Sequence, residues 1–494
     1  MNSRTWAGFL FFAGLWFVNV IYHQLWFDEL QAWGIARASG DLLELYRNTQ
    51  YEGHPMLWHT VIWPAARLTG DPRGMQVVHG GLVLLSLGLL WFRSPFTLLE
   101  KGLLSGSYFL VYEYAVLSRC YGLGVALLFL FLTFRERFSR HPWLGWLILG
   151  LLANTHFLLA MLAVMLAVVW VAVERRQGRN VLPGVSLFVL MLGAALVCVS
   201  RADPHTAIES AWSFDFSFSR VMKKLDTFAD AFAPLENPFS LDYWRPGMGA
   251  WLSLIAGFLT LWLIWRYLEP QKVALGAFLA LSAGMIAFFY LRYGGHSWHG
   301  GLMFLFLVSL VWLLRDKGLR LGPPVAFLIL LCLNAGGGLK AVVASKFTPI
   351  SRAHEAARWI RDHGLENEFW IGYQYASFSI AVCLDRPIFD VESGHMTRYV
   401  DYGVSKERRP MPLVELSGWV QADLGQRKVA RAYLVVGECG KGNLHERACG
   451  LLKLHRELEL AELARFPRGE NSGESYLLYR VDGIRGKQSS LFAR

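Results

Sequence analysis

Long apolar segments recur along the first two thirds of the 494-residue chain, and they constrain its fold more than any other feature. About 20 consecutive apolar residues suffice for a helix to cross a bilayer. With 54% hydrophobic and 17% charged residues, the chain is too apolar for one soluble domain and too charged to lie in the membrane throughout. We therefore predict a polytopic helical membrane region with about eleven spans, several of them short. They lie near residues 6–27, 76–92, 97–115, 120–134, 143–155, 157–173, 183–199, 248–265, 273–291, 301–314 and 324–339.

The charges of the connecting loops predict the orientation. If the N-terminus is cytoplasmic, the cytoplasmic loops read "FRSP", "RERFSRHP", "ERRQGRN", "RYLEPQK" and "RDKGLR". Each loop carries Arg or Lys, as the positive-inside rule requires. Residues 28–75, residues 200–247 and everything from about residue 340 onward then lie on the outer side. We expect a multi-pass protein of the bacterial inner membrane, with these segments in the periplasm.

The last third of the chain predicts a separate domain. We expect a transmembrane domain at residues 1–340 and a soluble periplasmic α/β domain at residues 341–494. "VARAYLVVGEC" and "SYLLYRVDG" are typical of strands, and "HERACGLLKLHRELELAELARF" between them is interpreted as a helix. Cys439 and Cys449 could form a disulfide in an oxidising compartment, and two free thiols remain the alternative.

Two adjacent acids, Asp28 and Glu29, follow the first span directly. A carboxylate at the edge of the hydrocarbon is costly unless it faces water, a metal or a partner, so this placement indicates a site. The alternative is that both acids cap the next helix, whose N-terminal dipole favours negative charge. Trp26, Leu30 and Trp33 share one helical stripe, and Asp28 is turned about 200° from Trp26, away from that stripe.

Further candidates lie at outer helix ends. Glu52 and His54 precede Pro55 in a loop that opens a helix; they could take part in the site, hold a divalent ion such as zinc, magnesium or manganese, or only shape the turn. His156 is expected to be a packing residue. The remaining candidates are Arg119, Tyr121, Arg292, His296 and His299, which could bind a phosphate, although the two arginines could instead reach the lipid headgroups.

Several motifs in this order resemble one family. The acidic pair after the first span, "YEGHPMLWH", "SRCYGLG", "LANTHFLLA" and "LRYGGHSWHGGLMF" together resemble bacterial integral-membrane glycosyltransferases of the GT-C type. These are relatives of the protein O-mannosyltransferases and of the lipid A aminoarabinose transferase. The resemblance covers roughly the first 350 residues. It implies a GT-C-like helical membrane domain, here with a C-terminal α/β domain.

The resemblance also implies a reaction. A sugar would move, with inversion, from a polyprenyl-phosphate carrier to a glycan, lipid or protein acceptor on the periplasmic face. Asp28 would act as the general base, and Glu29 or Glu52 would orient it or hold a cation. The lipid phosphate would be bound by His54, Arg119, Tyr121, Arg292, His296 and His299.

Rival functions stay open on the sequence alone. The net charge of +10 is spread through loops and tail without a basic block interleaved with aromatics, so nothing favours nucleic-acid binding. A transporter or flippase of lipid-linked glycans usually shows internal repeats or charges at the bilayer midplane, and neither is evident here. A non-catalytic envelope-assembly protein is a third interpretation.

Overall fold

The chain divides into two compact units. The computed structural model describes all residues except 1, 135–140, 177, 201–213, 236–242, 245–249, 374–376, 392, 402–414, 417, 419, 421–430, 438–456, 468–473 and 485–494. Unit 1 comprises residues 1–22, 49–61 and 76–347, and unit 2 comprises residues 23–48, 62–75 and 348–494. Unit 2 therefore contains two segments of the predicted transmembrane domain, and the predicted boundary after residue 340 stays a prediction. Cys439 and Cys449 lie outside the described residues.

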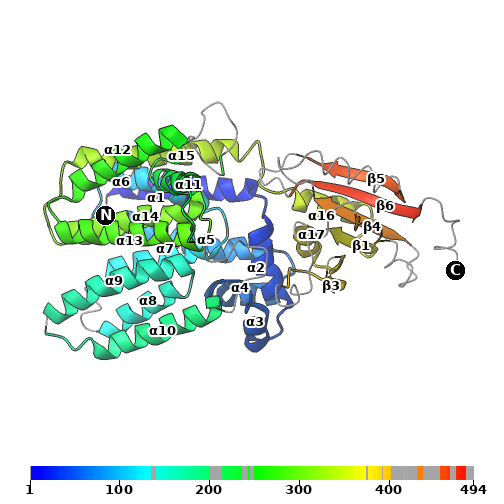
Figure 1. The fold of residues 1–494 in the computed structure, drawn as a ribbon, viewed down its shortest axis with the longest axis horizontal. Coiled ribbons are helices and arrows are strands. Elements are labelled where there is room, and N and C mark those ends of the chain that lie inside the picture. Colours follow the sequence, from blue (N-terminus) through cyan, green and yellow to red (C-terminus); the bar gives the residue numbers. More distant parts are fainter. Residues whose placement is uncertain are drawn as a thin grey trace. The chain divides into compact units, whose positions relative to one another are not determined.

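Unit 1 is helical (Figure 1). Its helices are α1 Ser3–Tyr22, α6 Leu98–Ser105, the π-helix η1 Phe109–Glu113, α7 Cys120–Phe134, α8 Pro142–Ala153, α9 Phe157–Arg176, α10 Leu182–Ser200, α11 Phe218–Asp230, α12 Ala250–Leu268, α13 Lys272–Leu291, α14 Ser297–Asp316 and α15 Pro324–Ala344. Helices α4 Leu57–Leu68 and α5 Arg73–Arg93 contribute residues to both units. Within unit 1, α8 packs against α7, α9 and α10.

The apolar helices match the predicted spans closely. Among the described residues, six helices are long and apolar enough to cross a membrane, namely α1, α5, α10, α13, α14 and α15. Four shorter apolar helices coincide with predicted spans near residues 120–134, 143–155, 157–173 and 248–265. The chain is a multi-pass membrane protein with a helical membrane body.

One predicted span is interrupted. The segment near residues 97–115 is not a continuous helix, because α6 ends at Ser105 and η1 begins at Phe109. Gly106 caps α6, and the Ser107 hydroxyl donates to the carbonyl of Leu104 at 2.6 Å. A hydroxyl that bonds its own backbone in this way competes with the regular helical ladder.

Unit 2 is built on a six-stranded mixed sheet with the strand order β3-β2-β1-β4-β6-β5 (Figure 1). The strands are β1 Phe369–Tyr373, β2 Ile388–Asp390, β3 His395–Thr397, β4 Ala432–Gly437, β5 Leu458–Phe466 and β6 Tyr476–Ile484. The pairs β1–β2 and β1–β4 are parallel, and the other three pairs are antiparallel. The helices are α2 Phe27–Ala38, α3 Leu42–Asn48, α16 Ala353–Asp362 and α17 Ser377–Leu384.

The core of this unit follows the alternation of its strands. Leu434 and Val436 of β4 and Tyr479 and Val481 of β6 are buried in one cluster, as residues two apart on one sheet face should be. The helix predicted over "HERACGLLKLHRELELAELARF", residues 445–466, is wrong from residue 458 onward, where β5 pairs with β6. Residues 445–456 of this segment lie outside the described residues. The alternation of Leu458 and Leu460 with glutamates suits an edge strand, and pairing outweighs helix propensity there.

Helix α2 is held to the C-terminal part of the chain by a reciprocal pair of hydrogen bonds. The Gln31 amide donates to the carbonyl of Val400 at 2.8 Å and accepts from its N–H at 2.9 Å. The predicted stripe is buried, with Leu30 and Trp33 completely inside and Trp26 5% exposed. The segment after the first span is thus an integral part of unit 2.

Candidate functional site

Four rings gather in the interior of unit 1 from distant parts of the chain. His54, in the turn before α4, lies 4.9 Å from His156 between ring centroids. His156, between α8 and α9, lies 5.0 Å from Tyr121 at the start of α7 and 5.8 Å from His299 in the first turn of α14. We call His54, Tyr121, His156 and His299 the histidine cluster. Three of its four members are residues that the sequence predicted for a phosphate site.

Burial keeps the imidazoles of this region uncharged. The pKa of His54 is lowered to about 4, mainly by burial and in part by the charge of the nearby Arg119. Burial likewise lowers the pKa of His59, in the first turns of α4, to about 3, with His54 as the second cause. Among the described residues, Nδ1 of His54 and both ring nitrogens of His59 have no hydrogen-bond partner. Such buried nitrogens are expected to meet a ligand or water.

Arg119 supplies positive charge beside the cluster. Its guanidinium carbon lies 5.3 Å from the centroid of the Tyr121 ring, and its charge also lowers the pKa of His156. A fixed positive charge attracts an anion, and the uncharged rings around it can donate hydrogen bonds to that anion without being protonated first. The arrangement therefore suits a phosphate group.

The remaining predicted residues of unit 1 are His296, Arg292 and Glu52. His296 immediately precedes α14, and its ring lies 5.7 Å from that of His299. Arg292 ends α13, four residues before His296. Glu52 lies in the turn that precedes α4 and is partly buried. Of the predicted set, His54, Arg119, Tyr121, His296 and His299 are thus connected through ring and cation contacts.

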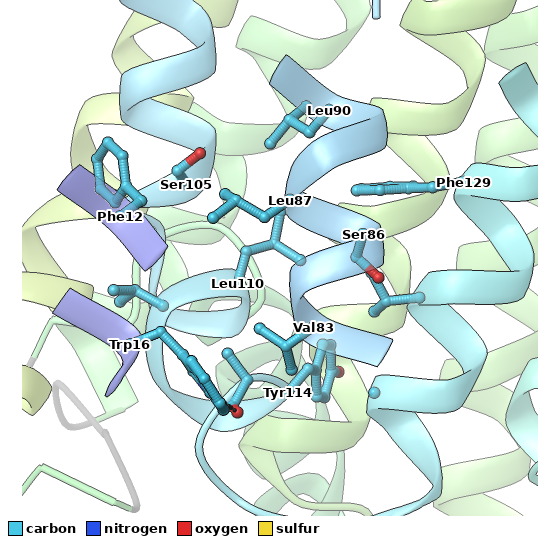
Figure 2. Close-up of a pocket in the computed structure, with 14 residues that line it drawn as sticks. Phe12, Trp16, Val83, Ser86, Leu87, Leu90, Ser105, Leu110, Tyr114 and Phe129 are labelled. Carbon is cyan, nitrogen blue, oxygen red and sulfur yellow. Dashed lines mark hydrogen bonds between the residues drawn. The ribbon is translucent and has the colours of Figure 1, made fainter. Parts of the chain in front are cut away.

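Figure 2 shows a cavity of unit 1 that is lined mainly by apolar side chains, with Tyr114 among them. About 40 Å³ of the cavity admits the centre of a water-sized molecule, and the empty space including open solvent at its mouth is about 510 Å³. The cavity is lined from α1, α5, α7 and the η1 segment, including Phe12, Trp16, Leu87, Tyr114 and Phe129. Tyr114 also stacks on Tyr121, with ring centroids 5.1 Å apart. One tyrosine therefore borders both the apolar cavity and the polar cluster.

The predicted acids Asp28 and Glu29 belong to unit 2, at the start of α2. Glu29 is completely buried, and its Oε2 lies 2.8 Å from Nε2 of His23 and accepts from the N–H of Trp26 at 3.2 Å. Its carboxylate thus holds the beginning of the helix. The capping interpretation therefore holds for Glu29. Asp28 is partly exposed.

A buried acid that the sequence did not suggest lies close to this pair. Glu474 precedes β6, is 1% exposed, and accepts a hydrogen bond from the Ser379 hydroxyl of α17 at 2.6 Å. The pKa of Glu474 is raised to about 8, mainly by burial and in part by the charges of Asp28 and Glu29. Nothing in the local sequence marks Glu474, because its burial depends on segments more than 90 residues away.

The described residues contain no group of three or more His, Cys, Asp and Glu side chains that could hold a metal ion. The predicted pair Glu52 and His54 therefore stays a prediction. His156, interpreted from the sequence as a satisfied packing residue, has two hydrogen bonds, one with the Tyr121 hydroxyl and one from the Leu158 N–H. The sequence did not assign it to the phosphate site.

Comparisons with known proteins identify the fold. No protein-family model matches the sequence, and no curated protein matches it. The match to a solved structure confirms the predicted fold, a helical membrane body with a C-terminal domain built on a mixed β-sheet. The matching structure is ArnT from Cupriavidus metallidurans bound to undecaprenyl phosphate, with a TM-score of 0.52 and 14% sequence identity. The match covers 97% of this chain and 98% of that one.

Proposed function

We propose that this protein transfers a sugar from a polyprenyl-phosphate carrier to an acceptor at the periplasmic face of the inner membrane. The observation that carries the proposal is the histidine cluster beside Arg119 and the apolar cavity. A lipid phosphate has an anionic head and an apolar tail, and unit 1 offers a surface for each. The similar fold of ArnT, whose structure contains undecaprenyl phosphate, supports the same carrier chemistry.

The head group would be bound by His54, Arg119, Tyr121 and His299, with Arg292 and His296 close by in the chain. Arg119 provides the charge, and the neutral rings provide hydrogen bonds. Both stabilise the negative charge that builds up on the phosphate as the sugar leaves. The cavity lined by Phe12, Trp16 and Leu87 suits the first isoprenoid units, because burying apolar surface contributes about 25 cal/mol per Å².

The acceptor would be activated by Asp28. An acceptor hydroxyl or amine becomes a good nucleophile when a positioned carboxylate takes its proton. Glu29 already binds His23 and the Trp26 N–H, so it is suited to support rather than to proton transfer. A single displacement by the activated acceptor inverts the configuration at the sugar carbon. Glu52 is proposed to orient the base or hold a cation.

Replacing Asp28 tests this proposal. Asp28→Asn keeps the size of the side chain but cannot take a proton, so the transfer rate should fall about 10²- to 10⁴-fold. The rate is measured in proteoliposomes with a radiolabelled undecaprenyl-phosphate-linked sugar and an extract of envelope lipids and glycans. Glu29→Gln should reduce the rate less. Near wild-type transfer by Asp28→Asn, with the variant inserted normally, would contradict the role of Asp28.

A further inference from the structure

We propose that His156 is a positioning residue that turns the Tyr121 hydroxyl so that its proton points toward the phosphate of the lipid-linked donor. The inference rests on the proposed function and deepens it. It concerns a residue that makes no predicted contact with the donor. His156 would act through a chain of hydrogen bonds that runs from the backbone of α9 to Tyr121.

The backbone of α9 determines which nitrogen of His156 carries the proton. The N–H of Leu158 donates to Nδ1 of His156 at 3.1 Å, so Nδ1 is an acceptor and carries no hydrogen. A neutral imidazole must then carry its proton on Nε2. Nε2 lies 3.2 Å from the hydroxyl oxygen of Tyr121. His156 therefore donates this hydrogen bond, and Tyr121 accepts it.

The surroundings of His156 keep the ring in this neutral form. His156 is 4% exposed, and burial lowers its pKa well below the ordinary value. The nearby His54 and Arg119 lower it further, since each disfavours a second positive charge. A doubly protonated ring would also lose the bond from Leu158, because Nδ1 would no longer accept.

The consequence for Tyr121 is a hydroxyl proton directed away from His156. The hydroxyl is completely enclosed, as Tyr121 is 1% exposed. In the part of the chain that the structure describes, His156 is its one hydrogen-bond partner. A buried hydroxyl is stabilised by a second partner, and a phosphate oxygen beside Arg119 would supply an acceptor. Tyr121 is thereby prepared to donate to an anion.

His299 has the same arrangement. The N–H of His296 donates to Nδ1 of His299 at 3.0 Å, so His299 also presents Nε2–H. The rings of His156 and His299 stack with an angle of 26° between their planes. Two backbone N–H groups from different elements thus select the same tautomer in neighbouring rings. The site consists of donors whose direction is determined before the ligand arrives, which lowers the reorganisation needed on binding.

The tautomer can be measured without any activity. The full-length protein, labelled with ¹⁵N histidine and held in lipid nanodiscs, should give nitrogen resonances of a neutral Nε2–H ring for two buried histidines. His156→Gln should remove one of them and His299→Gln the other. A neutral Nδ1–H ring or a charged ring for His156 at neutral pH would overturn the proposal.

Binding of undecaprenyl phosphate tests the consequence for Tyr121. Tyr121→Phe and His156→Leu should each weaken binding roughly 10- to 100-fold, the range for a hydrogen bond to a charged group. The double variant should bind no more weakly than the weaker single variant, because both changes remove the same interaction. His156→Gln, whose amide can still donate to Tyr121, should recover most of the affinity.

Tyr267→Phe is the matched control. Tyr267 of α12 is a buried tyrosine outside the cavity lining, and its hydroxyl accepts from Arg315 at 2.8 Å, so its loss should lower thermal stability and leave the affinity unchanged. Wild-type affinity in folded His156→Leu, or additive losses in the double variant, would overturn the positioning role alone. Wild-type protein that binds no undecaprenyl phosphate would overturn the proposed function and the positioning role with it.

Discussion

The two units bury ionisable groups of opposite kinds. Unit 1 encloses His54 and His59, bases whose pKa falls to about 4 and about 3. Unit 2 encloses Glu474, an acid whose pKa rises to about 8. In all three cases burial is the largest cause, because an apolar surrounding disfavours the charged form whatever its sign. The comparison teaches that these three buried groups are uncharged at pH 7, His54 and His59 by releasing a proton and Glu474 by retaining one.

Because of this difference, the stability of the two units should depend on pH in opposite ways. For His54 and His59 the unfolded chain binds more protons between the lowered and the ordinary pKa, so their contribution to stability is lost as the pH falls below about 6.5. For Glu474 the folded chain binds more protons between about 4.5 and 8, so stability is lost as the pH rises through that window. The two units should therefore respond to pH in opposite directions.

The largest expected effect is on the stability of unit 1 as the pH falls. Below pH 6.5 its free energy of unfolding should fall by up to about 1.4 kcal/mol per pH unit for each of the two histidines. Hydrogen-exchange mass spectrometry of the full-length protein, corrected for the intrinsic exchange rate, follows peptides from residues 49–61. In the His59→Phe variant the free energy of unfolding should fall less steeply as the pH decreases. His141→Gln, at an exposed histidine of the same unit, is the control, and equal slopes in all three proteins would contradict the prediction.

The second largest expected effect is on the stability of unit 2 as the pH rises. Between about pH 5 and 8 the free energy of unfolding of unit 2 should fall by up to about 1.4 kcal/mol per pH unit, because one carboxyl must ionise on unfolding. Glu474→Gln keeps an acceptor for Ser379 and cannot ionise, so its peptides from β4 and β6 should exchange equally slowly at both ends of this range. If the variant keeps the wild-type slope, another group is responsible.

A third prediction compares the two arginines that the sequence proposed for the phosphate. Arg119 lies over the Tyr121 ring and helps lower the pKa of His54 and His156, whereas Arg292 ends α13. Arg119→Gln should weaken undecaprenyl phosphate binding roughly 10- to 100-fold, since it removes a charge-assisted contact. Arg292→Gln should change the affinity less. A larger loss with Arg292→Gln would move the phosphate site toward the end of α13.

The sequence predicted the membrane body well, because the spacing of apolar segments reports bilayer thickness directly. It also placed His54, Arg119, Tyr121 and His299 at outer helix ends, and the structure brings these four together. Their mutual distances could not be predicted. They depend on how α4, α7 and α14 pack, and no local pattern records that.

Two other features lay beyond sequence patterns for the same reason. The last nine residues of the expected helix form strand β5 instead, because a partner strand, β6, is available only in the folded unit. Residues 23–48 joined unit 2 through contacts such as Gln31 with Val400, which are 369 positions apart. Hydrophobic periodicity predicts elements, but it does not predict which distant element will cover them.

The smallest expected effect concerns the ion pair between Arg37 and Asp385 in unit 2. This pair is partly exposed, whereas Glu474 is buried. Arg37 donates to both carboxylate oxygens of Asp385, at 3.2 and 3.1 Å, and the two side chains are 26% and 31% exposed. Water screens such a pair, so Arg37→Met should cost about 0.5–1 kcal/mol, part of it through the bond to the Ala66 carbonyl. The cost should shrink in high salt, whereas the effect of Glu474→Gln should not.

Asp385 allows the charge to be separated from the backbone. Its φ of 53° lies in the left-handed region, which asparagine tolerates nearly as well as aspartate and alanine does not. Asp385→Asn should therefore lose only the charge, at most about 0.5 kcal/mol in thermal unfolding of the full-length protein. Asp385→Ala should lose about 1 kcal/mol more through backbone strain. Suppose that both variants lose the same free energy of unfolding and that this loss persists in 1 M salt. The Asp385 side chain would then stabilise unit 2 by packing and not by charge. The contrast between the exposed ion pair and the buried neutral Glu474 would not hold at this position.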